Sequence, residues 1–202
     1  MEILSVVSGY TTLYMLLSAA VPEPYVAKTR VFLSLLNATL LSALSARTIL
    51  YISQANPVAH LLEDEQNTTL ANYVIGFFSA DMLVGYVFTP ESMGFLTGYV
   101  HHTVYVCLVY YLREHSHSNL IYLCLPFEIP TLILDLNRLD PQKRYNGAFA
   151  VSFVLCRVMY NIYIITLMSE LSAAYQSIAT GMLLMHLYWL QEWFSKQYQI
   201  QE

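Results

Sequence analysis

Charged residues are scarce in this chain. Only 11% of its 202 residues are Asp, Glu, Lys or Arg, whereas 56% are hydrophobic. About a quarter of the residues in an ordinary soluble domain are charged, so this composition excludes that class. The mean hydropathy of +0.47 instead predicts a polytopic membrane protein. The formal net charge of −5 gives no reason to expect a nucleic-acid partner.

Cysteine is rare as well. The three cysteines, Cys107, Cys124 and Cys156, all lie within apolar segments. Their spacing matches no metal-binding motif, and none lies in a loop where an oxidising compartment could join two of them. We therefore expect buried thiols, no disulfide framework and no metal site.

Lysine and histidine are too few for two classes of membrane protein. The three lysines, Lys28, Lys143 and Lys196, lie outside the last apolar segment, which excludes a retinal Schiff base there. Six histidines are too few for the repeated clusters of di-iron lipid hydroxylases and desaturases. His115 and His117 follow a charged segment end, which predicts an exposed loop rather than a ligand set. The sequence also lacks the Gly-x-Ser-x-Gly elbow of serine hydrolases and the Asp-Arg-Tyr and Asn-Pro-x-x-Tyr motifs of G-protein-coupled receptors.

Long apolar runs, in contrast, fill most of the chain. A transmembrane helix needs about 20 mostly apolar residues to cross the hydrocarbon core. Seven segments meet this length, at residues 3–21, 31–52, 70–88, 94–112, 119–137, 147–169 and 171–194. The connections between them are short and hold most of the prolines. We predict one all-α domain over residues 1–202, a polytopic bundle of about seven transmembrane helices.

The first of these segments ends in Ser18, Ala19 and Ala20, small residues of the kind that end a signal peptide. A signal peptide begins with a positively charged region, and no Lys or Arg precedes this apolar run. We therefore expect a retained transmembrane helix.

The basic residues predict the orientation, because cytosolic loops carry the excess of Lys and Arg. Arg113 alone would lie on one side of the membrane, and the opposite side would carry Lys28, Arg30, Arg138, Lys143, Arg144 and Lys196. The N-terminus should then be lumenal and the C-terminus cytosolic. The sequon Asn67-Thr68-Thr69 would lie in a lumenal loop, within reach of glycosylation.

Ionisable side chains inside the apolar segments are the costly feature of this sequence. A charge at the bilayer centre costs about 2.5–3.5 kcal/mol on insertion scales, so such residues usually face the bundle interior and serve a function. The residues of this kind are Arg47, Asp81, His101, His102, Glu128, Arg157 and His186. Two interpretations remain open for each residue, namely a structural ion pair or packed histidine and a functional site.

The adjacent histidines His101 and His102 are the strongest functional candidates. Neighbouring helical positions point about 100° apart, so one ring can point into a cavity while the other packs against another helix and fixes a tautomer. A carboxylate partner allows an imidazole to act as a general base. Asp81 in the preceding segment and Glu128 in the following segment are the candidate partners.

Glu128 lies between Pro126 and Pro130. Each proline removes a backbone donor and crowds the preceding turn, which predicts a kinked or unwound helix around the glutamate. Irregular backbone at membrane depth is tolerated where it is buried in protein or lines a cavity. A simple packing kink is the alternative.

Five motifs occur in a characteristic order and spacing, namely FFSADMLVGY, GYVHHTVYV, LPFEIPTLILDLNRL, FVLCRVMYN and HLYWLQEWFSK. They resemble those of the TLC domain family, which includes ceramide synthases, TRAM and smaller TLC-domain proteins. The resemblance covers about residues 28–196. It implies helices packed around a central lipid cavity, residence in the endoplasmic reticulum and a cytosolic C-terminus.

The resemblance also implies roles for the candidate residues. In ceramide synthases the histidine pair is needed to transfer an acyl group from acyl-CoA to a sphingoid amine. His101 and His102 would act as base and oxyanion donor, with Asp81 and Glu128 orienting them. The residues expected to bind the lipid or acyl-CoA are Arg157, Tyr105 and Arg47. Membrane lipids are the expected partners. We expect no resident cofactor, with acyl-CoA as a co-substrate.

One motif departs from the ceramide synthases. Those enzymes carry a His-Asp-x-x-Asp pattern after the histidine pair, whereas this chain has one carboxylate and no histidine in Pro126-Phe127-Glu128-Ile129-Pro130. In this respect it resembles the small TLC-domain proteins implicated in phospholipid composition. Two functions remain open. One is an acyl-CoA-dependent acyltransferase with a sphingoid or lysophospholipid acceptor, and the other is a non-enzymatic lipid-binding protein that regulates membrane composition or interacts with cargo.

Overall fold

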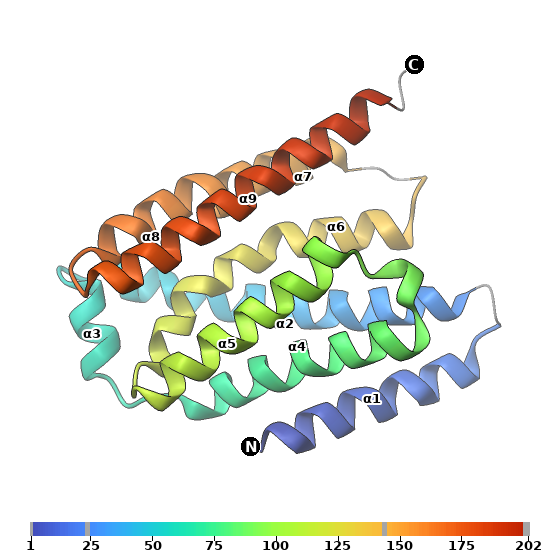
Figure 1. The fold of residues 1–202 in the computed structure, drawn as a ribbon, viewed down its shortest axis with the longest axis horizontal. Coiled ribbons are helices and arrows are strands. Elements are labelled where there is room, and N and C mark those ends of the chain that lie inside the picture. Colours follow the sequence, from blue (N-terminus) through green and yellow to red (C-terminus); the bar gives the residue numbers. More distant parts are fainter. Residues whose placement is uncertain (1, 23–24, 143–144, 200–202) are drawn as a thin grey trace. The chain divides into compact units, whose positions relative to one another are not determined.

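A computed structural model describes residues 2–22, 25–142 and 145–199 of the chain. Within these ranges every regular element is a helix (Figure 1), which confirms the predicted all-α class. Five helices are long and apolar enough to cross a membrane, at Ile3–Ala20, Lys28–Ile52, Thr68–Phe88, Ser118–Leu139 and Asn146–Met168. They coincide with five of the seven predicted segments.

The other two predicted segments are also helical. The π-type helix η3 (Phe95–Val100) continues into α5 (His101–Glu114), and α9 runs from Ala173 to Gln199. Polar residues such as His101, His102 and His186 lower their hydropathy, so they are not among the five apolar helices. Seven spans therefore stay a prediction, whereas a membrane protein with several apolar helices is what the structure supports.

The chain forms two compact units. Unit 1 comprises residues 1–37 and 61–122, and unit 2 comprises residues 38–60 and 123–202. In unit 1, α4 (Thr68–Phe88) packs against both α1 (Ile3–Ala20) and α5 (Figure 1). The first contact is close because α4 has Gly76 at this point, where a Cβ would lie 2.5 Å from Cβ of Val6.

Side-chain hydrogen bonds join the connection between the short helix α3 (Pro57–Glu63) and α4 to residues Asn119 and Tyr122. The Asn67 side chain accepts a hydrogen bond from the Leu70 N–H at 2.9 Å and so caps α4. Its Nδ2 donates to the Tyr122 hydroxyl at 2.9 Å. The buried Asn119 accepts from the Asn67 N–H at 2.9 Å and donates to the Glu65 carbonyl at 3.1 Å. The nitrogen that a glycan would use is thus already engaged, although the sequon is present.

Unit 2 contains the predicted helix irregularity. The 3₁₀ helix η4 (Ser118–Glu128) ends at Glu128, and α6 (Ile129–Leu139) begins at the next residue. The change of helix type falls between Pro126 and Pro130, so the prediction of irregular backbone around Glu128 is confirmed.

A second irregularity lies further along unit 2. The π-type helix η5 (Val154–Met159) joins α7 (Asn146–Phe153) to α8 (Tyr160–Met168), and α9 runs beside α8 (Figure 1). Phe149, Phe153 and Trp189 form the apolar core at this contact.

Candidate functional site

Asp81 is the centre of a polar cluster in unit 1, which we call the Asp81 cluster and define as Tyr10, Arg30, Asp81 and His102. Asp81 lies on α4 and is 3% exposed. Arg30, on α2 (Val26–Ile52), donates from Nε to Oδ1 at 2.9 Å and from Nη2 to Oδ2 at 2.6 Å. The Tyr10 hydroxyl donates to Oδ1 at 3.2 Å. The two-bond arginine–carboxylate geometry neutralises a charge that would be costly to bury alone.

His102 lies against the same carboxylate. Its Nδ1 is 3.4 Å from Oδ2 of Asp81, which is within ion-pair range. The contact lacks hydrogen-bond geometry, and Nδ1 has no other hydrogen-bond partner in the described part of the chain. Catalytic hydrogen bonds are often long before substrate binds. The adjacent carboxylate favours the tautomer that carries its proton on Nδ1, which leaves Nε2 as the basic nitrogen.

His101 has a different environment from its neighbour. It is 6% exposed, and its ring lies 4.5 Å from the Tyr105 ring and 6.2 Å from the Phe78 ring, both in edge contacts. Phe78 also contacts His102, with 4.8 Å between ring centroids. One imidazole thus packs among aromatic rings while the other faces a carboxylate, as the 100° offset between adjacent positions predicts.

The cluster lies toward one end of its helices. Arg30 follows the start of α2 by about one turn, and Asp81 precedes the end of α4 by about two turns, or roughly 11 Å. His102 follows the start of η3 by about two turns. All three residues are therefore closest to the end of unit 1 at which α1 connects to α2 and α4 connects to η3. The π-type turn before His101 is of a kind that is frequent at functional sites.

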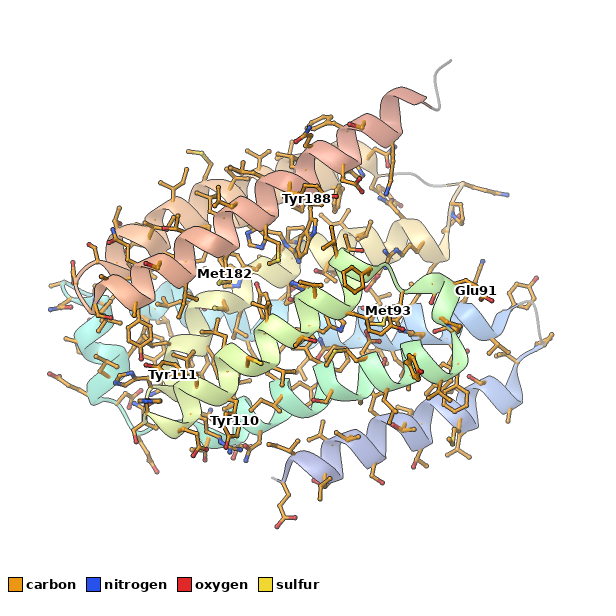
Figure 2. All side chains as sticks on the ribbon, in the orientation of Figure 1. Glu91, Met93, Tyr110, Tyr111, Met182 and Tyr188 are labelled. Carbon is orange, nitrogen blue, oxygen red and sulfur yellow. The ribbon has the colours of Figure 1, made fainter. Side chains whose placement is uncertain are left out.

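Met93, labelled in Figure 2, lies in the α4–η3 connection, against Gly85 of α4 and Gly98 of η3. It is 6% exposed and fills space left by two glycines, because a Cβ on Gly98 would lie 2.6 Å from Met93 Cγ and one on Gly85 would overlap its sulfur. The preceding residue, Ser92, accepts a hydrogen bond from Nη1 of Arg30 at 3.1 Å. The guanidinium thereby links the connection to Asp81.

Arg157 and Glu128 belong to unit 2, whereas the histidine pair belongs to unit 1. Arg157 donates from Nε to the Phe127 carbonyl and from Nη2 to the Thr131 hydroxyl, each at 2.8 Å. Its guanidinium lies 5.4 Å from the centre of the Phe153 ring. Glu128 is buried and interacts electrostatically with Arg157. The partner of Glu128 that the structure identifies is thus Arg157, and the predicted orientation of the histidines by Glu128 stays a prediction.

Arg47 differs from the expectation for an intramembrane charge. Its side chain is exposed and lies 5.7 Å from the centre of the Tyr51 ring, one turn further along α2. Arg47 is about a turn and a half from the end of α2 opposite to Arg30. Such a position lets a long side chain extend toward the membrane interface, which explains how it is tolerated without burial.

Sequence reasoning missed Arg30 and Tyr10, and it also missed Asp135. Arg30 was assigned to a loop, although it lies inside α2 and pairs with Asp81. Asp135 is fully buried on α6, 3.4 Å from the Arg138 guanidinium. A buried carboxylate requires a cation or donors nearby, so the sequence signalled that a partner exists but not which residue it is.

Comparison of the chain with protein-family models, with curated proteins and with solved structures found no match. The resemblance of the five motifs to the TLC domain family stays a prediction. Among the described residues, no three His, Cys, Asp or Glu side chains converge as a metal-ligand set.

Proposed function

We propose that this is a membrane protein of lipid metabolism that binds acyl-CoA at the histidine pair and transfers the acyl group to a sphingoid or lysophospholipid acceptor. The observation that carries the proposal is the contact between His102 and a buried carboxylate that is itself held by Arg30 and Tyr10. A base oriented by a fixed carboxylate is the arrangement that acyl-transfer chemistry uses to activate a nucleophile.

The proposed reaction uses both histidines. Nε2 of His102 takes a proton from the acceptor amine or hydroxyl as its nitrogen or oxygen attacks the thioester carbonyl. The imidazole of His101 donates a hydrogen bond to the oxyanion that forms. The carbon–sulfur bond then breaks, and the proton on His102 passes to the departing CoA thiolate. The products are the acylated lipid and free CoA.

The membrane arrangement belongs to the same proposal. All seven predicted segments span the membrane of the endoplasmic reticulum, with a lumenal N-terminus and a cytosolic C-terminus. This orientation places the α1–α2 and α4–η3 connections in the cytosol, where acyl-CoA is found. The acyl chain extends from the histidines into a lipid cavity between the helices, and Tyr105 lies beside it. Arg157 and Arg47, which are remote from the cluster along the chain, bind lipid rather than CoA.

A second function is favoured by a specific observation. The Asp81 carboxylate already accepts hydrogen bonds from Arg30 and Tyr10, and His101 is packed against Tyr105 and Phe78. Satisfied polar groups of this kind also suit a protein that binds a lipid without reacting with it. Regulation of membrane composition or of cargo interaction would then replace catalysis.

The test is acyl transfer from radiolabelled palmitoyl-CoA to a panel of sphingoid bases and lysophospholipids by purified protein. His102→Asn preserves an N–H donor near Asp81 but lacks Nε2, so the proposal expects a loss of about 10²–10⁴-fold in rate. His101→Ala should also lose activity, and the exposed His60→Ala should retain it. Full activity of folded His102→Asn excludes the base, and no product with any acceptor favours the binding protein.

A further inference from the structure

His186 is a fully buried histidine of α9 whose two ring nitrogens have different surroundings. Its Nδ1 lies 2.9 Å from the backbone carbonyl oxygen of Arg157, in η5. A carbonyl oxygen can only accept a hydrogen bond, so Nδ1 carries the proton and donates it. The neutral ring then has an unprotonated Nε2 that can only accept.

The Nε2 of His186 has no hydrogen-bond partner among the described residues. The ring is bordered by aromatic side chains, with centroid distances of 5.1 Å to Phe127, 6.2 Å to Phe153 and 5.7 Å to Trp189. The two Phe rings carry no donor, and no hydrogen bond joins the indole N–H of Trp189 to Nε2 among the described residues. Buried acceptors are hydrogen-bonded in the great majority of proteins, so Nε2 is a position at which a donor from outside the chain can bind.

Asn161 of α8 provides a second polar group at the same place. It is fully buried, and its amide nitrogen is placed 3.3 Å from Nδ1 of His186, whereas its Oδ1 has no hydrogen-bond partner among the described residues. Amide nitrogen and oxygen are interchangeable in shape. Since Nδ1 donates to Arg157, the amide oxygen is better placed toward Nδ1, which turns the NH₂ group away as a donor. The pair then offers one acceptor, Nε2, and one donor group.

We propose that His186 and Asn161 form a binding site for a hydroxyl group inside unit 2. An O–H group donates to Nε2 and can also accept from the Asn161 amide, whereas an alkyl chain or a carbonyl cannot donate to Nε2 at all. The hydroxyl belongs either to a water molecule or to a lipid alcohol such as a monoacylglycerol. This site is separate from the histidine pair, and it does not depend on acyl transfer.

The test is solid-state nuclear magnetic resonance of the full chain with ¹⁵N-histidine, reconstituted in bilayers of dimyristoylphosphatidylcholine, a lipid without a hydroxyl group. His186 signals are assigned from their loss in His186→Gln. The proposal expects a protonated Nδ1, an unprotonated Nε2 and magnetisation transfer from a hydroxyl proton to Nε2. Transfer in these bilayers identifies water as the ligand. Transfer that requires added monoolein identifies a lipid alcohol.

The same spectra can overturn the proposal. A protonated Nε2 would contradict the tautomer, and an unprotonated Nε2 that receives no transfer in either bilayer would show that the nitrogen binds no hydroxyl. Asn161→Leu tests the second group while His186 keeps its bond to the Arg157 carbonyl. If Asn161 takes part, its replacement should weaken the transfer to Nε2 and leave the protonated Nδ1 signal in place.

Discussion

The two units hold an arginine side chain in different ways. In unit 1, Arg30 pairs with the carboxylate of Asp81 through two hydrogen bonds. In unit 2, Arg157 bonds to neutral oxygens of Phe127 and Thr131 and lies over aromatic rings. Arg30 binds its carboxylate directly, whereas Arg157 interacts electrostatically with Glu128 and makes its hydrogen bonds to neutral oxygens, with ring faces beside it.

This difference suggests different uses for the two units. Charge cancellation in unit 1 leaves a neutral cluster in which the ring of His102 is the only titratable group not yet hydrogen-bonded to Asp81. The contact between this ring and a held carboxylate is the geometry on which the proposed proton transfer depends. In unit 2, Arg157 organises the helix contact, since its carbonyl accepts from His186 and its side chain donates to the Phe127 carbonyl of η4 and the Thr131 hydroxyl of α6. That setting suits fixed recognition rather than proton transfer.

Removing one partner from the neutral pair should have the largest effect. Arg30→Leu leaves Asp81 buried without its cation and should lower the free energy of unfolding by about 3–5 kcal/mol, whereas the double variant Arg30→Leu/Asp81→Leu should recover much of the loss. Reversible unfolding in detergent micelles measures the free energy of unfolding of Arg30→Leu, Asp81→Leu and the double variant. A double variant whose loss equals the sum of the single losses would contradict the pairing.

Arg157→Lys should cost less but still be clear. Lysine keeps the charge but not the planar fork that reaches Phe127 and Thr131 together. Losing one hydrogen bond to a charged group predicts a loss of about 1.5–3 kcal/mol in unfolding free energy. Arg138→Lys is the matched control, because its side chain is 55% exposed. Equal stability of the two variants would mean that charge alone, without the fork, suffices in unit 2.

The hydrogen bonds of the Asn67 side chain lead to a prediction about its glycosylation. Because Nδ2 of Asn67 donates to Tyr122, we expect Asn67 to remain unglycosylated in cells, and Asn67→Ala to cost about 1 kcal/mol as a lost helix cap. Mobility before and after glycosidase treatment measures the modification. An acceptor sequon in a flexible extension before Met1 is the control, and it should be modified if the N-terminus is lumenal. Glycosylation at Asn67 itself would show that the hydrogen bond between Asn67 and Tyr122 breaks in cells.

The smallest effect concerns His117, in the connection before η4. Partial burial, followed by the nearby His115, lowers the pKa of His117 below its usual value of about 6.5. A lowered histidine pKa means that the folded state binds fewer protons, so His117 contributes stability above pH 6.5 that is lost as the pH falls below it. His117→Gln should make the stability of the protein slightly less dependent on pH between about 5 and 6.5. If His117→Gln instead made the stability more dependent on pH in this range, the pKa of His117 would be raised in the folded protein and not lowered.

Sequence predicted the helices better than the contacts between them. Apolar length located five membrane-length helices, and Pro126 and Pro130 located the change of helix type at Glu128. Both features depend on local chemistry. The predicted segment 31–52 leaves Arg30 outside, because α2 begins at Val26, before the apolar run starts. The pairing of Arg30 with Asp81 depends on how α2 and α4 pack, which local chemistry does not determine.

For the polar residues too, sequence predicts what depends on the local helix and not what depends on contacts between distant residues. A helix fixes the angular offset of His101 and His102, and their nearest partners differ, but the cavity that one of them should enter stays a prediction. Asn67 looked free because a sequon describes only three residues, whereas its actual partners Tyr122 and Asn119 lie far along the chain. Arg47 looked buried because hydropathy reports depth along a helix and not the face that a residue occupies.

The most direct test of the proposed function is to map where an acyl-CoA with a photoreactive chain labels the protein. We expect labelled peptides that contain Phe78, His102 or Tyr105, and loss of this labelling with excess unlabelled palmitoyl-CoA. The exposed Leu4 and Leu16 of α1 report non-specific contact with lipid. Labelling restricted to such exposed residues and unchanged by the competitor would contradict the claim that the histidine pair of unit 1 binds an acyl ligand.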